Sequence, residues 1–89
     1  MILFENITED YTSDVITIPN DLILTVTGRY GSASVVVDID IGAGYVPFCT
    51  FTASSLHILR LRLGDGASIK LRVVGSNGTN LTAAYLNCS

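Results

Sequence analysis

The side chains that could carry out chemistry in this sequence are few and scattered. His57 is the single histidine, and Ser54 and Ser55 lie too close to it along the chain to be oriented as a nucleophile and base pair. Asp38 and Asp40 share one face of an alternating stretch, but no further His, Cys or carboxylate side chains cluster with them, as a metal site requires. No spacing typical of a nucleotide-binding loop, a nucleophile elbow or a zinc protease occurs. The sequence therefore predicts no catalytic residue, no metal and no cofactor.

The two cysteines, Cys49 and Cys88, are far apart in the chain and lack the CxxC spacing of a redox or zinc motif. The apolar run that starts at Met1 is short and has no basic residues before it, unlike a signal peptide. No stretch is long enough to be a transmembrane helix. We therefore expect synthesis in a cytosol, where thiols stay reduced and act as small buried hydrophobes.

The clearest charge feature is a set of basic side chains that recur at every second position in two stretches predicted to pair as strands. On one face they would form a ladder of like charges, which is unfavourable unless acidic groups compensate. Asp38, Asp40 or a neighbouring subunit could supply those groups, so a solvated face and a partner interface both remain open. The net charge of −3 and pI near 4.7 disfavour nucleic acid and anionic membranes as partners. The basic residues concerned are Arg60, Arg62, Lys70 and Arg72.

Alternation of apolar and polar residues between positions 22 and 51 predicts three strands. The first two form a hairpin when Leu24 faces Ile39 and Val26 faces Val37, which leaves Gly31 and Ser32 as a two-residue turn. The expected inward side chains are Leu22, Leu24 and Val26 on the first strand, Val35, Val37, Ile39 and Ile41 on the second, and Pro47, Cys49 and Phe51 on the third.

The third strand pairs with the second when Val37 faces Cys49, which leaves the three-residue loop 42–44. A second three-stranded meander is predicted over 56–63, 67–74 and 80–87. Its expected register sets Leu61 against Leu71 and Val73 against Leu81. Two meanders that face each other bury both apolar faces, which predicts an all-β, antiparallel β-sandwich of the jelly-roll type rather than a closed barrel.

The N-terminal segment adds one or two strands, for about seven or eight in a single domain of residues 1–89. Residues 14–18 alternate like a strand and are stopped by the turn at Pro19. Ile2 to Phe4 is either a first strand or part of an extended arm, within residues 1–12, that lies on a neighbouring subunit. The sequence leaves these two interpretations open.

Apolar residues make up 48% of the chain and charged residues 15%, which is a high apolar share for so small a domain. Several of them fall on strand faces that are otherwise polar, namely Val36, Val46, Phe48 and Val74. Such residues suggest contact with other subunits. Val46 and Phe48 therefore join the four basic residues as a candidate partner interface.

The run LTVTGRYGSASVVV over 24–37, followed by a Gly-rich turn and the YVPF of 45–48, resembles small β-sandwich structural proteins of tailed bacteriophages. These proteins show a strand, a Gly-aromatic-Gly hairpin, a second strand, a Gly turn and an aromatic-x-Pro third strand. The resemblance covers about residues 22–86, including LGDGASIKLR over 63–72. This chain departs from it by having no Trp and by having Gly42-Ala43-Gly44 where Asp-Gly is usual.

This resemblance implies a non-enzymatic virion component: a capsid decoration protein, a head-fibre base or a tail-associated module. Such proteins are made in the host cytoplasm, typically assemble as trimers or larger oligomers, and bind major capsid or tail proteins. An alternative is a carbohydrate-binding adhesin module that stacks Tyr30 and Tyr45 on a sugar. A third hypothesis is a small regulatory domain that adds a strand to the sheet of a partner.

Overall fold

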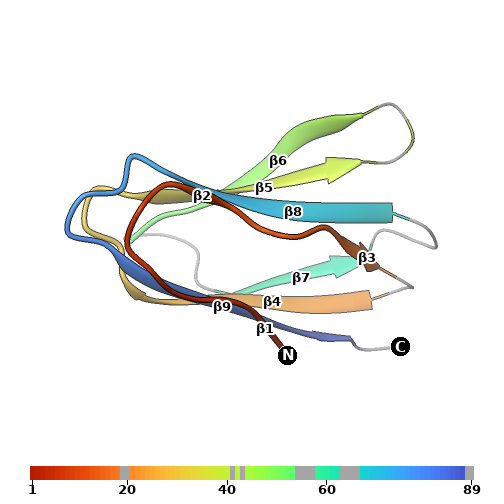
Figure 1. Cartoon of the computed structure of the whole chain (residues 1–89). Coiled ribbons are helices and arrows are strands. Elements are labelled where there is room, and N and C mark those ends of the chain that lie inside the picture. The colour runs from red at the N-terminus through yellow and green to blue at the C-terminus, as the bar shows by residue number, and fades with distance from the viewer. Residues whose placement is uncertain (19–20, 41, 43, 54–57, 63–66, 88–89) are drawn as a thin grey trace.

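The computed structural model describes residues 1–18, 21–40, 42, 44–53, 58–62 and 67–87, and within this part of the chain it contains strands and no helix. The strands form two antiparallel sheets stacked as two layers (Figure 1). In the four-stranded sheet the order is β1 (Ile2–Ile7), β9 (Asn80–Asn87), β4 (Asp21–Arg29) and β7 (Ile58–Arg62). In the five-stranded sheet it is β2 (Tyr11–Thr12), β8 (Ala67–Val74), β5 (Ser34–Asp40) and β6 (Tyr45–Phe51), and β3 (Ile16–Ile18) also pairs with β8. The all-β class and the two-sheet architecture are confirmed.

The core lies between the sheets and is filled by the side chains that alternation directs inward. Leu24 and Val26 of β4 face Val35 and Val37 of β5 across this space, and all four are fully buried. Burial of such apolar surface is the main force that holds two sheets together. Among the other predicted inward residues, Leu22, Ile39 and Phe51 are buried, Cys49 is half-buried and Pro47 is exposed, while Ile41 lies outside the described residues.

The predicted hairpin between the first two long strands is wrong, because β4 and β5 belong to different sheets. Leu24 therefore lies opposite Tyr85 of β9 and Leu59 of β7, rather than opposite Ile39. Alternation fixes which side chains face the core, but it is the same whether a short turn closes a hairpin or crosses from one sheet to the other. Gly31 lies in such a crossing turn.

The second predicted meander is wrong for the same reason. β7 pairs with β4 instead of β8, and β9 pairs with β4 and β1 instead of β8. The hairpin of β5 and β6 is confirmed, with Val35 opposite Phe51 and Val37 opposite Cys49. A register shift follows Val37, so that Asp38 lies opposite Pro47.

The N-terminal residues form β1 on β9 of the same chain, with Ile2 opposite Ala84. The Met1 ammonium group donates a hydrogen bond of 2.8 Å to the carbonyl of Tyr85. Ile2 to Phe4 is therefore a strand in this structure, and the predicted strand over 14–18 corresponds to β3.

Two turns far apart in sequence close one end of the sandwich against each other. The Thr79 hydroxyl donates to the carbonyl of Tyr30 at 2.7 Å, and the Arg29 Nε donates to the carbonyl of Gly78 at 2.8 Å. The backbone N–H of Ser32 donates to the carbonyl of Asn77 at 3.2 Å. These bonds tie the turn after β4 to the turn after β8, so they hold the two sheets in one relative position.

Candidate interaction surface

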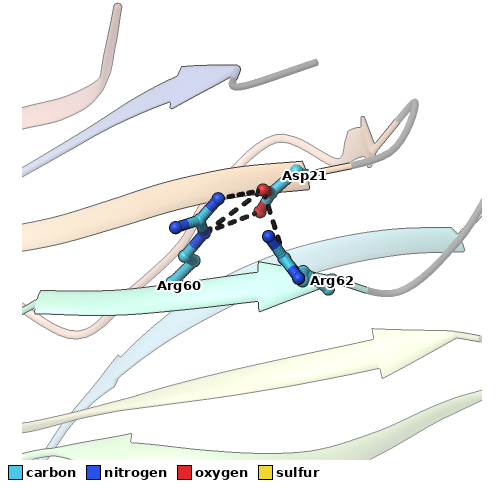
Figure 2. Close-up of polar contacts among 3 residues, drawn as sticks. All are labelled: Asp21, Arg60 and Arg62. Atoms are coloured by element: carbon cyan, nitrogen blue, oxygen red, sulfur yellow. Dashed lines mark hydrogen bonds and ion pairs between the residues drawn. The ribbon is translucent and has the colours of Figure 1, made fainter.

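Two arginines on β7 share one carboxylate on β4 (Figure 2). Arg62 lies directly opposite Asp21 in the sheet, and Arg60 reaches the same carboxylate diagonally. The Arg60 Nη2 lies 2.6 Å from Asp21 Oδ2, and the Arg62 Nε lies 3.4 Å from it. The hydrogen bond from Arg60 is the main reason that the pKa of Asp21 is lowered from its usual value. The Asp21 side chain is 8% exposed, whereas those of Arg60 and Arg62 are 54% and 73% exposed.

The other two basic residues of the predicted patch lie on the other sheet, on β8. Arg72 forms an ion pair with Asp38, with Nη2 3.2 Å from Oδ1, and this carboxylate raises the pKa of the guanidinium. The Lys70 ammonium lies 4.3 Å from the centroid of the Tyr45 ring, a cation–π contact. The predicted ladder of four basic side chains on two paired strands is therefore wrong, since β7 and β8 do not pair. Asp38 does supply compensation for one of the four.

The two carboxylates considered as metal ligands serve structural roles. Asp38 is the partner of Arg72, and Asp40 Oδ1 accepts hydrogen bonds from the backbone N–H groups of Gly42 at 2.8 Å and Gly44 at 3.2 Å. Within the described residues no group of three or more His, Cys, Asp or Glu side chains is arranged to hold a metal ion. Cys49 is a free, half-buried cysteine, and burial raises the pKa of its thiol.

His57, the single histidine, and Cys88, one of the two cysteines expected to be reduced, lie outside the described residues. In the part of the chain that the structure covers, no helix is long and apolar enough to span a membrane.

The predicted apolar interface residues on β6 are exposed. Val46 is 53% exposed and Phe48 is 51% exposed, on a strand that forms an edge of the five-stranded sheet. Val36 on the neighbouring strand β5 and Val74 on β8 are half-buried. Val46 and Phe48 therefore offer apolar surface to a partner, but on a different sheet from Arg60 and Arg62.

The two tyrosines of the glycan hypothesis differ in their surroundings. The Tyr30 side chain is part of the core, and the residue is 4% exposed. Stacking a sugar on its ring is not compatible with this burial. Tyr45 is 36% exposed and holds the Lys70 ammonium against its ring.

The outer side of the four-stranded sheet carries an apolar surface that strand alternation alone does not predict. One register row across the sheet runs from Ile2 through Ala84 and Thr25 to Ile58. In the adjacent row Leu86 lies opposite Ile23. Ile2, Ile58 and Leu86 are 56%, 62% and 61% exposed.

A shallow depression between β4 and β9 on this side is lined by Ile23, Thr25, Ala84, Tyr85 and Leu86. We call the surface formed by Ile2, Ile23, Ile58, Ala84 and Leu86 the outer apolar face. In the sequence this face is indicated by Ile23 and Leu86. Both occupy outward positions in strands whose inward positions are apolar as well. Such a face is larger than the isolated exposed hydrophobes common on monomeric proteins.

Comparison of the chain with protein-family models, with curated protein sequences and with solved structures finds no match.

Proposed function

We propose that this chain is a non-enzymatic structural protein of a tailed-phage particle, which acts by binding between neighbouring subunits of the shell or tail. The observation that carries the proposal is the outer apolar face, where Ile2, Ile58 and Leu86 are each more than half exposed. A surface of this kind gains free energy when a partner covers it. The sequence resemblance to phage β-sandwich proteins supplies the class of partner.

We further infer that the sandwich is a jelly roll. When β2 and β3 are counted as one strand, the chain pairs in nested order: β1 with β9, β2 and β3 with β8, β4 with β7, and β5 with β6. A long antiparallel ribbon folded over on itself has this order, and the contacts of β9 with β4 and of β8 with β5 close it into two sheets. Jelly rolls are common in viral capsid domains and in lectins.

Two separate apolar surfaces support the expectation that the chain binds both its own copies and a second virion protein. One is the outer apolar face, and the other is the β6 edge with Val46 and Phe48. We expect a homo-oligomer, with a trimer favoured by the resemblance. Buried area added across the joint between shell subunits would raise the free energy needed to open it.

The carbohydrate-binding alternative is weakened, because Tyr30, one of the two tyrosines proposed to stack on a sugar, is buried. Tyr45 alone, already in contact with Lys70, offers a single ring. Sugar-binding sites of this type rely on aromatic rings that are free to stack, so the structural role is the better supported of the two.

The test is to inactivate the gene in the genome that encodes it, to supply a tagged copy in the host cell, and to purify the particles. We expect the tagged chain in the particles, and a lower survival on heating for particles that lack it. Particles that contain none of the tagged chain, or a genome that produces no particles, would refute the proposal.

A matched pair of variants tests the role of the outer apolar face. Leu86→Lys places a charge on it, whereas Val15→Lys changes an apolar residue of similar exposure, 54%, that lies between β2 and β3. Both exposed substitutions should change the free energy of unfolding by no more than about 0.5 kcal/mol. We expect Leu86→Lys to be depleted from particles and Val15→Lys to be incorporated normally. Equal incorporation of the two variants would remove the outer apolar face from the proposal.

A further inference from the structure

The turn between β8 and β9 contains the pair Asn77-Gly78, which the proposed binding role does not use. An asparagine followed by glycine can react with its own backbone. The glycine nitrogen attacks the side-chain amide carbon, ammonia leaves, and a five-membered succinimide ring forms. Glycine favours this step because it has no Cβ atom to obstruct the attack and its backbone is flexible. Of the five asparagines in the sequence, Asn77 is the one that precedes a glycine.

Both reacting groups are accessible in the folded chain, since Asn77 and Gly78 are exposed. In the part of the chain that the structure describes, neither the side-chain amide of Asn77 nor the backbone N–H of Gly78 makes a hydrogen bond. Gly78 has a φ of +67°, and a Cβ atom added to it would meet no atom within 4 Å. The Asn77 side chain can therefore turn onto the Gly78 nitrogen without losing a hydrogen bond of its own.

Two other asparagines of the described chain lack these conditions. Asn80 begins β9 and is followed by Leu81, which is fully buried and lies opposite Gly28 in the sheet. Asn6 is followed by Ile7, whose β-branched side chain crowds its own backbone nitrogen. Asn80 therefore serves as an internal control close to the pair in the same chain.

The turn that carries the pair is one half of the closure that ties the two sheets together. The Asn77 carbonyl accepts a hydrogen bond of 3.2 Å from the backbone N–H of Ser32, and the Gly78 carbonyl accepts one of 2.8 Å from the Arg29 Nε. A Cβ atom added to Gly31 would lie 2.1 Å from the carbonyl oxygen of Asn77. The backbone of this turn therefore lies directly against the crossing turn after β4.

We infer that Asn77 is a site of spontaneous modification, at which the folded chain converts this residue through a succinimide to aspartate and isoaspartate. Water opens the ring at either of its two carbonyl carbons. Opening at the former side-chain carbonyl gives aspartate, and opening at the former backbone carbonyl gives isoaspartate. The net change in both cases is hydrolysis of the amide, which consumes one water, releases one ammonia and oxidises nothing. The reaction needs no enzyme, and the inference is independent of any place in a particle.

The modification acts on the closure between the sheets. Both products carry a new carboxylate beside Gly78, the residue that Arg29 binds. In isoaspartate the main chain runs through the former side chain, so the turn is longer by one carbon atom. Because the turn already lies against Gly31, the longer main chain has to move away and lose the hydrogen bond from Ser32. We therefore expect the modified chain to unfold at a lower urea concentration than the fresh chain.

The test incubates the purified full chain at mildly alkaline pH in water labelled with the heavy isotope of oxygen. Peptide mapping by mass spectrometry should show conversion at Asn77, with labelled oxygen in the product, and an intact Asn80. The rate should rise with pH, because the attacking nitrogen has to lose its proton. The pair Asp65-Gly66 can form the same ring but lies outside the described residues, and mapping separates its peptide from that of Asn77.

A variant pair connects the chemistry to stability. Asn77→Ser removes the reacting amide from the exposed turn, whereas Asn80→Ser removes the amide of the control residue. During incubation we expect the urea midpoint of Asn77→Ser to stay constant. The midpoints of Asn80→Ser and of the unsubstituted chain should fall together as Asn77 converts. Fresh samples of both variants, unfolded in urea, check that each one folds.

A parallel incubation in guanidinium chloride gives the rate for the unfolded chain. Conversion of Asn77 in guanidinium chloride but not in the folded chain overturns the inference, because the turn then protects the amide, and absence of conversion in both states overturns it as well. Equal conversion of Asn77 and Asn80 in the folded chain has the same meaning, since neither the glycine nor the open turn would then matter. A midpoint that stays constant while Asn77 converts refutes the effect on the closure.

Discussion

Gly28 lies on β4 where the backbone of β9 leaves no room for a side chain, and its replacement by alanine tests the sheet topology. Gly28 has a φ of +115° and lies opposite Leu81. A Cβ atom added to it would lie 2.2 Å from the backbone carbonyl oxygen of Asn80. That oxygen is part of the β9 backbone, so it cannot turn away as the end of a side chain could.

The expected cost of Gly28→Ala has two components. A residue with a side chain in this unfavourable backbone region costs about 1–3 kcal/mol. Displacing the β9 backbone adds about 1–3 kcal/mol, the usual cost of forcing an extra carbon into a packed site. The total of about 2–6 kcal/mol compares with about 4–13 kcal/mol for the whole stability of a domain of this size.

Gly42→Ala is the matched control. Gly42 has a φ of +120°, but a Cβ atom there would meet no atom within 4 Å. This variant should therefore lose the conformational component alone, about 1–3 kcal/mol. The difference between the two variants measures the close approach of β4 and β9.

Urea unfolding followed by circular dichroism gives the midpoint and slope for each variant. We expect a clearly lower midpoint for Gly28→Ala than for Gly42→Ala, and a Gly28→Ala chain that does not fold at all has the same meaning. Equal losses would contradict the pairing of β4 with β9. The hairpin of β4 and β5 that the alternating pattern predicts would then be the better topology.

Two further outcomes follow from the titratable groups. Because the folded pKa of Asp21 lies below its ordinary value of 3.8, its stabilising effect is complete above pH 3.8 and is lost as the pH falls through the folded pKa. The urea midpoint should therefore fall with acid in this window, and it should fall less steeply in the Asp21→Asn variant. An equal dependence of the midpoint on pH in the two proteins would contradict the role of the cluster. Because burial raises the pKa of the Cys49 thiol, its alkylation by iodoacetamide near neutral pH should be slower in the folded chain than in urea, measured in a Cys88→Ser background by mass spectrometry. Equal rates in the two states would show that the thiol is not shielded.

The positions of the strands and their buried faces were predictable from the sequence, because both depend on local alternation. The predicted segments 67–74 and 80–87 have the bounds of β8 and β9. Strand pairing was not predictable in this way. It depends on contacts between distant turns, such as the hydrogen bond from Thr79 to Tyr30, which leave no periodic signal in the sequence.

The candidate interaction surface was likewise predictable in its exposed residues but not in the pairing of its strands. Arg60 and Arg72 both carry their charge away from the core, as their position in the alternating pattern requires, but they lie on two different sheets. The alternating pattern indicates on which side of a strand a residue lies, but not which strands pair. It therefore identified the exposed basic residues correctly and placed them on one surface incorrectly. Leu86 was missed because a single apolar residue at an outward position becomes informative only when its neighbours across the sheet are known.

Two clusters, one in each sheet, are built on the same plan. In each, one carboxylate faces a basic residue directly and a second one diagonally: Asp38 faces Lys70 and binds Arg72, and Asp21 faces Arg62 and binds Arg60. In the five-stranded sheet a further strand lies beyond the carboxylate, and its Tyr45 ring accepts the Lys70 ammonium.

In the four-stranded sheet the arginines stand on the edge strand β7, and the strand beyond the carboxylate is β9. The register of the strands, and not closeness in the sequence, therefore places each carboxylate between two basic side chains.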